Sequence, residues 1–267
     1  MHELLKAIIL GIVEGITEFL PVSSTGHLIL INQWIEFSEP FTKKFDIIIQ
    51  LGAILAVVVF FRRKLLPLTN GWKSFLESNA YNIWKKVLIG VIPASIIGFL
   101  FHKKIEDLLF NPTTVSLALV FGGVALILLE NRKKNITINS MASLKYSTAL
   151  WIGFIQCLAM VPGTSRSAAT IIGAMVLGCS RIVAVEYSFF LAIPTIFLAS
   201  VYSIYKMGLS ISSTEIIVLV VGFVVSYFVA WLVIAGFMNF ISKRDFKLFG
   251  YYRILLGGVI LFYFLLK

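Results

Sequence analysis

The chain has 267 residues, of which 59% are hydrophobic and 13% are charged, and its mean hydropathy is +0.95. Soluble domains are about a quarter charged, so this composition excludes an ordinary soluble protein and indicates an integral membrane protein. The net charge of +10 does not indicate nucleic-acid binding, because basic cytoplasmic loops of a membrane protein account for it.

The apolar stretches are long and show no strand-like alternation. We therefore predict one all-α membrane domain over residues 1–267, with helices of about 20 apolar residues as spans. The predicted transmembrane helices are residues 46–61, 87–101, 113–129, 186–206, 214–238 and 250–266. The N-terminal stretch has no basic leader or small-x-small cleavage site, so we expect it to be retained.

Two further apolar stretches are interrupted near their middle by proline, serine, threonine and glycine. Residues 4–20 are followed by 26–35, and residues 147–161 are followed by 166–178. Each stretch is too short or too broken to cross a bilayer as a single helix. We therefore predict two re-entrant helix pairs in addition to about six transmembrane helices.

The two interruptions, called here the first hinge (residues 20–27) and the second hinge (residues 161–167), resemble each other in sequence. With one residue of slippage, the aligned pairs are Glu14 with Gln156, Pro21 with Pro162, and Ser24 with Ser165. The segment FGGVALILL also resembles LGGVILFYF near the C-terminus. These matches predict two repeats, 1–130 and 145–267, and three spans in each half favour inverted topology.

The distribution of basic residues predicts the orientation. With three spans in each half, most of them fall on one side: Arg62, Arg63, Lys64, Lys73, Lys85, Lys86, Arg132, Lys133, Lys134, Lys145, Arg181, Lys243, Arg244 and Lys247. The opposite side keeps Lys43, Lys44, Lys103 and Lys104. By the positive-inside rule the first side is cytoplasmic, so the first hinge enters from outside and the second from the cytoplasm.

Glu14 and Glu18 precede the first hinge at a spacing of four, which places both on one helix face. An acid within the membrane costs at least a few kcal/mol, and two neighbouring carboxylates repel. The pair indicates a divalent cation, a basic partner or proton transfer. The alternative is that both lie near the surface and are solvated.

After Pro21 ends the first helix, Ser23, Ser24 and Thr25 stand where the next helix begins. They are predicted caps, and a helix start also offers free N–H groups to an anion. His27 follows Ser24 by three residues, on the same face if that helix continues. It is a candidate acid or base, or else a buried histidine with ordinary partners.

The second hinge has the same layout with other side chains. Gly163 allows close approach of a ligand to the backbone, and Thr164, Ser165 and Ser167 supply hydroxyls. Arg166 supplies a planar donor group suited to phosphate oxygens. An intramembrane arginine needs an anion, which could be the glutamate pair, a ligand phosphate or both. A structural Arg–Glu bridge is the simpler interpretation.

If the hinges meet, they bring Glu14, Glu18, Ser24 and His27 close to Ser165, Arg166 and Thr170. This set suits phosphoryl transfer, because donors stabilise charge on phosphoryl oxygens while acids hold a metal or orient water. The chain contains no Walker, G-x-G-x-x-G, H-E-x-x-H or G-x-S-x-G motif. The alternative is a transporter or flippase for a phosphorylated polyprenyl lipid, which would also use inverted halves.

At these residues the chain resembles the undecaprenyl-diphosphate phosphatase family, also called the bacitracin-resistance protein family. The matching motifs are E-x-x-x-E at Glu14 and Glu18, P-V-S-S-T-G-H ending at His27, and P-G-T-S-R-S over 162–167. FDIIIQLGAILA from Phe45 and EYSFFLAIP from Glu186 also match. One departure is Ala168, where the family often has glycine.

The resemblance implies a hydrolase of the bacterial cytoplasmic (inner) membrane that converts undecaprenyl diphosphate to undecaprenyl phosphate and inorganic phosphate. This reaction recycles the lipid carrier of peptidoglycan synthesis and confers bacitracin resistance, with Mg²⁺ or Ca²⁺ as the cofactor and a site that faces outward. Small membrane enzymes often pair, so a homodimer is a further expectation, although no residue indicates it.

The resemblance also implies roles for individual residues. Glu14 and Glu18 would be catalytic and bind the metal, Ser24 and His27 would serve the nucleophilic step, and Arg166 would be catalytic. Whether Ser24 or a water attacks phosphorus stays open. The implied substrate-binding residues are Ser23, Thr25, Gly163, Thr164, Ser165, Arg166, Ser167 and Thr170.

Overall fold

The computed structural model describes residues 2–35, 37–38, 41–66, 75–76, 78–132, 135–208 and 211–266. Lys73, Lys133 and Lys134, which the sequence assigns to the cytoplasmic side, lie outside these residues. The described chain is helical and carries no strand, only an isolated bridge between Ile138 and Cys179. The predicted all-α class is therefore confirmed for this part of the chain.

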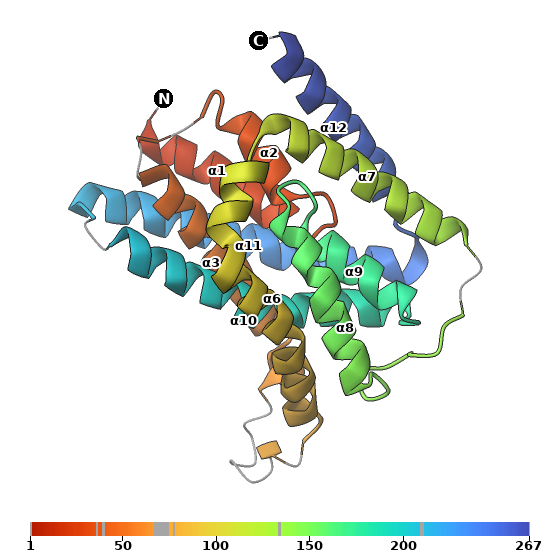
Figure 1. Ribbon diagram of the computed structural model, residues 1–267. Coiled ribbons are helices and arrows are strands. Elements are labelled where there is room, and N and C mark those ends of the chain that lie inside the picture. The colour runs from red at the N-terminus through yellow and green to blue at the C-terminus, as the bar shows by residue number, and fades with distance from the viewer. Residues whose placement is uncertain are drawn as a thin grey trace.

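The helices follow one another in the order shown in Figure 1. They are α1 (Glu3–Thr17), α2 (Ser24–Ile31), α3 (Phe41–Phe60), α4 (Arg62–Leu65), α6 (Asn79–Leu109), α7 (Pro112–Asn131), α8 (Tyr146–Gln156), the 3-10 helix η2 (Cys157–Met160), α9 (Arg166–Val176), α10 (Arg181–Met207), α11 (Ser213–Lys243) and α12 (Lys247–Leu266).

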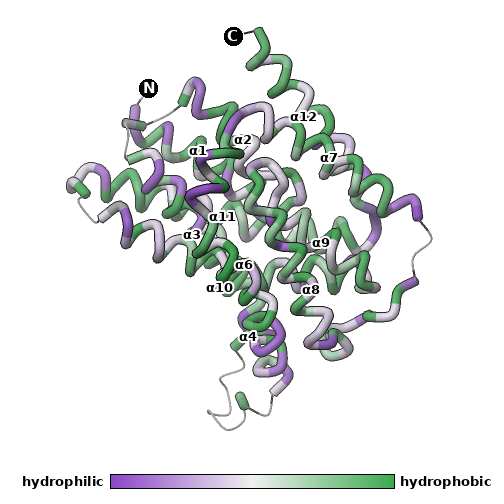
Figure 2. The backbone as a smooth tube through the Cα atoms, viewed as in Figure 1, coloured by the Kyte–Doolittle hydropathy of each residue, from purple (hydrophilic) through white to green (hydrophobic). Residues whose placement is uncertain are grey.

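Five helical segments in the described residues are long and apolar enough to cross a membrane: Asn79–Phe101, Pro112–Asn131, Arg181–Lys206, Ser213–Lys243 and Lys247–Leu266. Each contains one predicted span. The sixth predicted span, 46–61, lies largely in α3, whose first turns carry Lys43, Lys44 and Asp46 and so leave a shorter uncharged stretch. Figure 2 shows hydrophobic residues along most of α7 and α12 and hydrophilic ones near α4 and the adjoining end of α6.

Both predicted interruptions are present. The chain leaves the helix after Thr17, turns through Pro21 and resumes as α2 at Ser24. In the second half α8 tightens into η2, and after Pro162 the chain resumes as α9 at Arg166. Proline cannot donate the hydrogen bond that would continue a helix, which explains why both breaks fall beside one.

The packing joins elements that are distant in sequence. Helices α1 and α3 pack against α11, helices α8 and α10 pack against α6, and α7 packs against α12. The close contacts rely on glycine, because a Cβ at Gly11 would lie 2.8 Å from Gly222 O and one at Gly153 would overlap Gly90 O. Small residues let membrane helices approach in this way.

Candidate active site

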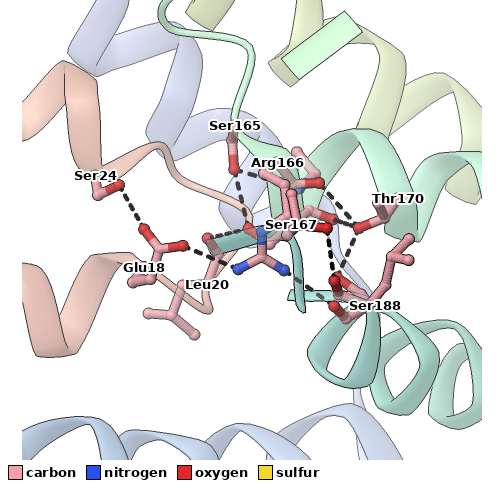
Figure 3. Close-up of polar contacts among 11 residues, drawn as sticks. Glu18, Leu20, Ser24, Ser165, Arg166, Ser167, Thr170 and Ser188 are labelled. Atoms are coloured by element: carbon pink, nitrogen blue, oxygen red, sulfur yellow. Dashed lines mark hydrogen bonds and ion pairs between the residues drawn. The ribbon is translucent and has the colours of Figure 1, made fainter. Parts of the chain in front are cut away.

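The carboxylate of Glu18, just after α1, connects the two hinges. Its Oε1 lies 2.9 Å from Nη2 of Arg166, and its Oε2 accepts a hydrogen bond of 2.9 Å from Ser24 Oγ (Figure 3). The side chains of Glu18 and Arg166 are 8% and 12% exposed. The expectation that acidic and guanidinium groups from the two hinges meet inside the protein is therefore confirmed.

Arg166 is the first residue of α9 and is held from several sides. Its Nη1 donates a hydrogen bond of 3.0 Å to the carbonyl of Ser188 in α10, and its guanidinium lies 5.9 Å from the centre of the Phe19 ring. Its Nε is buried and has no partner among the described residues. Two of the five guanidinium N–H groups thus fix the side chain, and the others, Nε–H among them, have no acceptor in the described chain.

Hydroxyl groups tie the second hinge to the first and to α10 (Figure 3). Ser167 Oγ donates to Leu20 O at 2.8 Å, and Ser165 Oγ lies 3.0 Å from Ser167 Oγ. Thr170 Oγ1 lies 2.6 Å from Ser188 Oγ and bonds to Arg166 O. These hydroxyls hold the hinge in place, and the expectation that Ser165, Ser167 and Thr170 bind substrate stays a prediction.

The two half-helices begin with the same local geometry. Ser23 and Ser165 are their N-caps, with φ of 72° and 71°, and they are the only non-glycine residues with positive φ in the described chain. Each side chain accepts a hydrogen bond from the backbone three residues on. The backbone geometry therefore pairs Ser23 with Ser165 and Ser24 with Arg166, whereas the sequence alignment paired Ser24 with Ser165. A serine with positive φ is strained by about 1–3 kcal/mol, and such strain concentrates at functional sites.

Glu14 and Gln156 are buried, and their polar side-chain atoms have no partner among the described residues. Neither carboxylate oxygen of Glu14 forms a hydrogen bond, although the residue is 0% exposed, and the amide of Gln156 is equally unpartnered. The charges of Glu18 and Asp46 repel the Glu14 carboxylate, and the charge of Arg166 attracts it without a hydrogen bond. A buried carboxylate without a donor is costly unless a cation or a proton compensates it, so Glu14 is suited to binding a cation.

A divalent cation fits this acidic pair in charge and in ligand type. Carboxylate oxygens are ligands of both Mg²⁺ and Ca²⁺, and Mg²⁺ commonly takes one or two carboxylates together with substrate phosphates and water. In the described residues no three His, Cys, Asp or Glu side chains gather as a metal-ligand group. Glu14 and Glu18 would therefore hold a cation jointly with the substrate.

His27 in α2 is engaged outside the Glu18 network. Its Nδ1 lies 2.7 Å from Ser23 O, its Nε2 lies 2.7 Å from Tyr252 Oη, and its ring stacks on Tyr252 at 5.6 Å between centroids. Both ring nitrogens are engaged, so His27 could transfer a proton to another group only after giving up its contact with Ser23 O or Tyr252 Oη.

The remaining hinge residues differ in what they contact. Thr25 and Thr164 form no side-chain hydrogen bond with any residue that the structure describes. Gly163 has φ of 91°, and a Cβ there would overlap Val115 O, so glycine is required at this position. The group that approaches the backbone of Gly163 closely in this structure is therefore α7.

Arg253 in α12 is a site residue that the sequence patterns did not single out. It is fully buried and donates only to backbone carbonyls: those of Leu119, Pro21, Ala118, Gly163 and Thr164, at 3.0–3.4 Å. It thereby joins α7, α12 and both hinges. An ionisable residue inside the apolar stretch 250–266 was the available signal. Ser188 and Tyr252 carried no comparable signal.

The comparisons with known proteins agree over nearly the whole chain. The family described as Bacitracin resistance protein BacA matches residues 7–259. A protein of Lachnoclostridium phytofermentans named undecaprenyl-diphosphatase is 47% identical over 99% of this chain and 98% of its own. Undecaprenyl-diphosphatase 1 of Clostridioides difficile is 50% identical over 99% and 97%. The undecaprenyl-diphosphatase of Enterococcus faecalis is 45% identical over 97% and 96%.

Proposed function

Because this chain belongs to the bacitracin resistance protein BacA family, we propose that it hydrolyses undecaprenyl diphosphate to undecaprenyl phosphate and inorganic phosphate. The reaction recycles the carrier lipid of cell-wall synthesis and confers resistance to bacitracin. The observation that carries this proposal beyond the family match is the contact of Glu18 with both Ser24 and Arg166 among apolar helices. Binding a lipid alone would not need an acid placed between a hydroxyl and a guanidinium.

In this reaction Arg166 binds the diphosphate. Its guanidinium is fixed by Glu18 and Ser188 O, while Nε is unpartnered among the described residues. The N–H groups at the start of α9 add donors and a positive helix dipole. Donors set in place before the reaction stabilise the charge that develops on the phosphoryl oxygens, typically by a few kcal/mol each.

Glu18 positions and deprotonates the nucleophile. Ser24 Oγ already donates to Glu18 Oε2 at 2.9 Å, so Glu18 can accept its proton as Ser24 attacks the terminal phosphorus. The same carboxylate can instead take a proton from a water that attacks in place of Ser24. In both routes the anhydride bond breaks, and the polyprenyl monophosphate leaves with the bridging oxygen. In the Ser24 route a water then hydrolyses the phosphoserine, which releases inorganic phosphate and restores the hydroxyl.

We infer that Glu14 and Glu18 hold a Mg²⁺ or Ca²⁺ ion during turnover, because Glu14 is buried with both oxygens unpartnered in the described chain. A bound cation would neutralise the diphosphate and add to the positive charge of Arg166, which pairs with Glu18. His27, held between Ser23 O and Tyr252, is the candidate for returning a proton to a leaving group or product.

The apolar chain of the substrate needs a hydrocarbon surface next to this site. A groove of about 410 Å³ lies between α3, α10 and α11 and is lined by Leu51, Ile54, Leu55, Val58, Ile193, Pro194, Phe197 and Phe223. Ile193 is about 8 Å along α10 from Ser188, at 1.5 Å per residue, and about 140° around the helix axis, so a long isoprenoid chain would have to bend around α10 to reach both. Part of the isoprenoid chain can lie in this groove while the diphosphate binds Arg166.

The proposed topology is a pair of inverted repeats, 1–130 and 145–267, in the bacterial cytoplasmic membrane with the site open to the outside. Three correspondences support it: the capping serines Ser23 and Ser165, the glycine contacts of α1 with α11 and of α8 with α6, and the pairing of α7 with α12. With α3 as a sixth span, both termini would lie on one side of the membrane and α4 on the other. Figure 2 has N and C at one end of the view and α4 at the other.

The test is phosphate release from undecaprenyl diphosphate by the purified protein in detergent with Mg²⁺ or Ca²⁺. We expect release that EDTA abolishes and that added cation restores. Reconstituted liposomes provide the contrast with transport: protein that moves the lipid between leaflets but releases no phosphate would be a flippase, and the proposal would be wrong.

A further inference from the structure

A second polar cavity lies away from the hinges. Its volume is about 910 Å³, and it lies between α4, the first turns of α6, the connection before α8 and the first turns of α10. Its lining includes Arg63, Lys64, Lys86, Lys145 and Glu186. Glu186 and Ser188 are two residues apart in α10, about 200° around the helix axis, so the cavity and the Arg166 site lie on different sides of α10.

The cavity is positively charged, and its cations outnumber its acids. Glu186 is its one lining acid among the described residues, and its Oε1 is already paired with Lys64 Nζ at 2.5 Å. Within the same part of the chain, Arg63, Lys86 and Lys145 have no carboxylate partner. Three cations around one cavity create a field that attracts an anion.

Lys86 carries the strongest part of this argument because it is only 6% exposed. Its ammonium donates to Met141 O at 2.7 Å and Ala142 O at 3.1 Å. An ammonium has three N–H donors, so one remains. Lys86 Nζ also lies 6.0 Å from the centroid of the Tyr146 ring. A buried charge that meets two carbonyl dipoles and a ring but no carboxylate is costly, and an anion in the cavity would compensate it.

The start of α8 adds further donors to the same cavity. Its N-cap, Lys145, makes no side-chain capping bond, so the first backbone N–H groups of α8 have no partner from the cap. By contrast, a serine caps α10 next to it. Tyr146 and Asn82, hydrogen-bonded at 3.2 Å, form part of the wall.

We propose that this cavity is a second anion site, which takes a phosphate group supplied either by the head group of an anionic membrane lipid or by free inorganic phosphate. Arg63 and Lys145 at its rim contact the phosphate oxygens, and Lys86 lies beneath them. The site lies on the side of the chain that carries most basic residues, where anionic head groups are attracted.

The test measures binding in an Arg166→Ala background, in which anion binding at the hinges is removed and hydrolysis plays no part. One arm uses native mass spectrometry with phosphatidylglycerol, and phosphatidylcholine as the reference lipid. The other arm titrates inorganic phosphate calorimetrically. Arg63→Gln and Lys145→Gln are the test variants because both residues are exposed at the rim, and exposed Lys103→Gln in α6 is the matched control.

We expect each rim variant to weaken binding about tenfold, the effect of losing one charge-assisted hydrogen bond, while Lys103→Gln binds as the parent does. Weakening in the lipid arm identifies a head-group site, and weakening in the phosphate arm identifies a phosphate site. If neither probe binds, or if both rim variants bind like Lys103→Gln, the proposal is wrong. Activity of the Arg166→Ala protein is not required for any outcome.

Discussion

Ser24 and Arg166 occupy equivalent positions in two half-helices, and both donate a hydrogen bond to the carboxylate of Glu18. A potential nucleophile and a cation are thus held on either side of one acid. Residues from the two halves of the chain complete a single site, which neither half provides alone.

The Glu18–Arg166 contact predicts a strict requirement for both side chains. Arg166→Ala should lower kcat/KM for phosphate release by about 10²–10³-fold, the usual loss when one stabilising donor is removed. Glu18→Gln should lower kcat/KM at least as much, because it removes both the partner of Arg166 and the proposed base. Arg166→Lys should recover little, since an ammonium cannot reproduce the planar donor geometry.

A matched control for this prediction is the pair of Arg181 and Glu130, which is bidentate at 2.7 and 2.9 Å. It lies outside the proposed site. Arg181→Gln should lower the free energy of unfolding by about 1–3 kcal/mol, because it removes the Arg181 guanidinium from the buried Glu130 carboxylate while the Phe246 N–H still donates to it. In the folded protein kcat/KM should not change. If Arg166→Ala and Arg181→Gln lowered kcat/KM equally, Arg166 would only support the fold.

Arg253 is predicted to hold the hinges together rather than to bind substrate. Arg253→Met should remove the donor of three carbonyls outside helices, those of Pro21, Gly163 and Thr164. The loss should cost about 3 kcal/mol or more, measured as a lower Tm in detergent. Arg253→Lys should recover part of this stability because it retains charge and three donors. A variant with wild-type Tm and wild-type activity would contradict the role.

Close packing of α8 on α6 is predicted to depend on Gly153, where a Cβ would overlap Gly90 O. Gly153→Ala should destabilise the protein by about 1–3 kcal/mol through overpacking. A Cβ at Gly236 in α11 would meet no described atom within 4 Å, so Gly236→Ala should be neutral or stabilise by up to about 1 kcal/mol. Thermal unfolding of both variants checks the contrast.

The apolar groove is predicted to bind part of the isoprenoid chain. Leu55→Trp would fill it and should raise KM for undecaprenyl diphosphate about tenfold through lost apolar contact. KM for a substrate with a much shorter isoprenoid chain should change less because that chain does not need the groove. Leu255→Trp, at an exposed position of α12, is the control. Equal effects on long and short substrates would place the chain elsewhere.

Much of this protein could be predicted from the sequence alone. Long apolar runs are helices in a bilayer, and proline and serine mark where a helix stops and restarts. Glutamate or arginine within such runs is too costly to stand without a partner or a function. These local rules identified both hinges, Glu14, Glu18 and Arg166, because each depends on neighbouring residues only.

The tertiary structure decided the rest. That Glu18 binds Ser24 and Arg166, that His27 pairs with Tyr252, and that Arg253 joins both hinges all depend on contacts between separate helices and hinges. The one-residue shift between the hinges became visible only through the backbone angles of Ser23 and Ser165. Sequence spacing describes which face a residue takes on its own helix, but the packing of separate helices determines what that face meets.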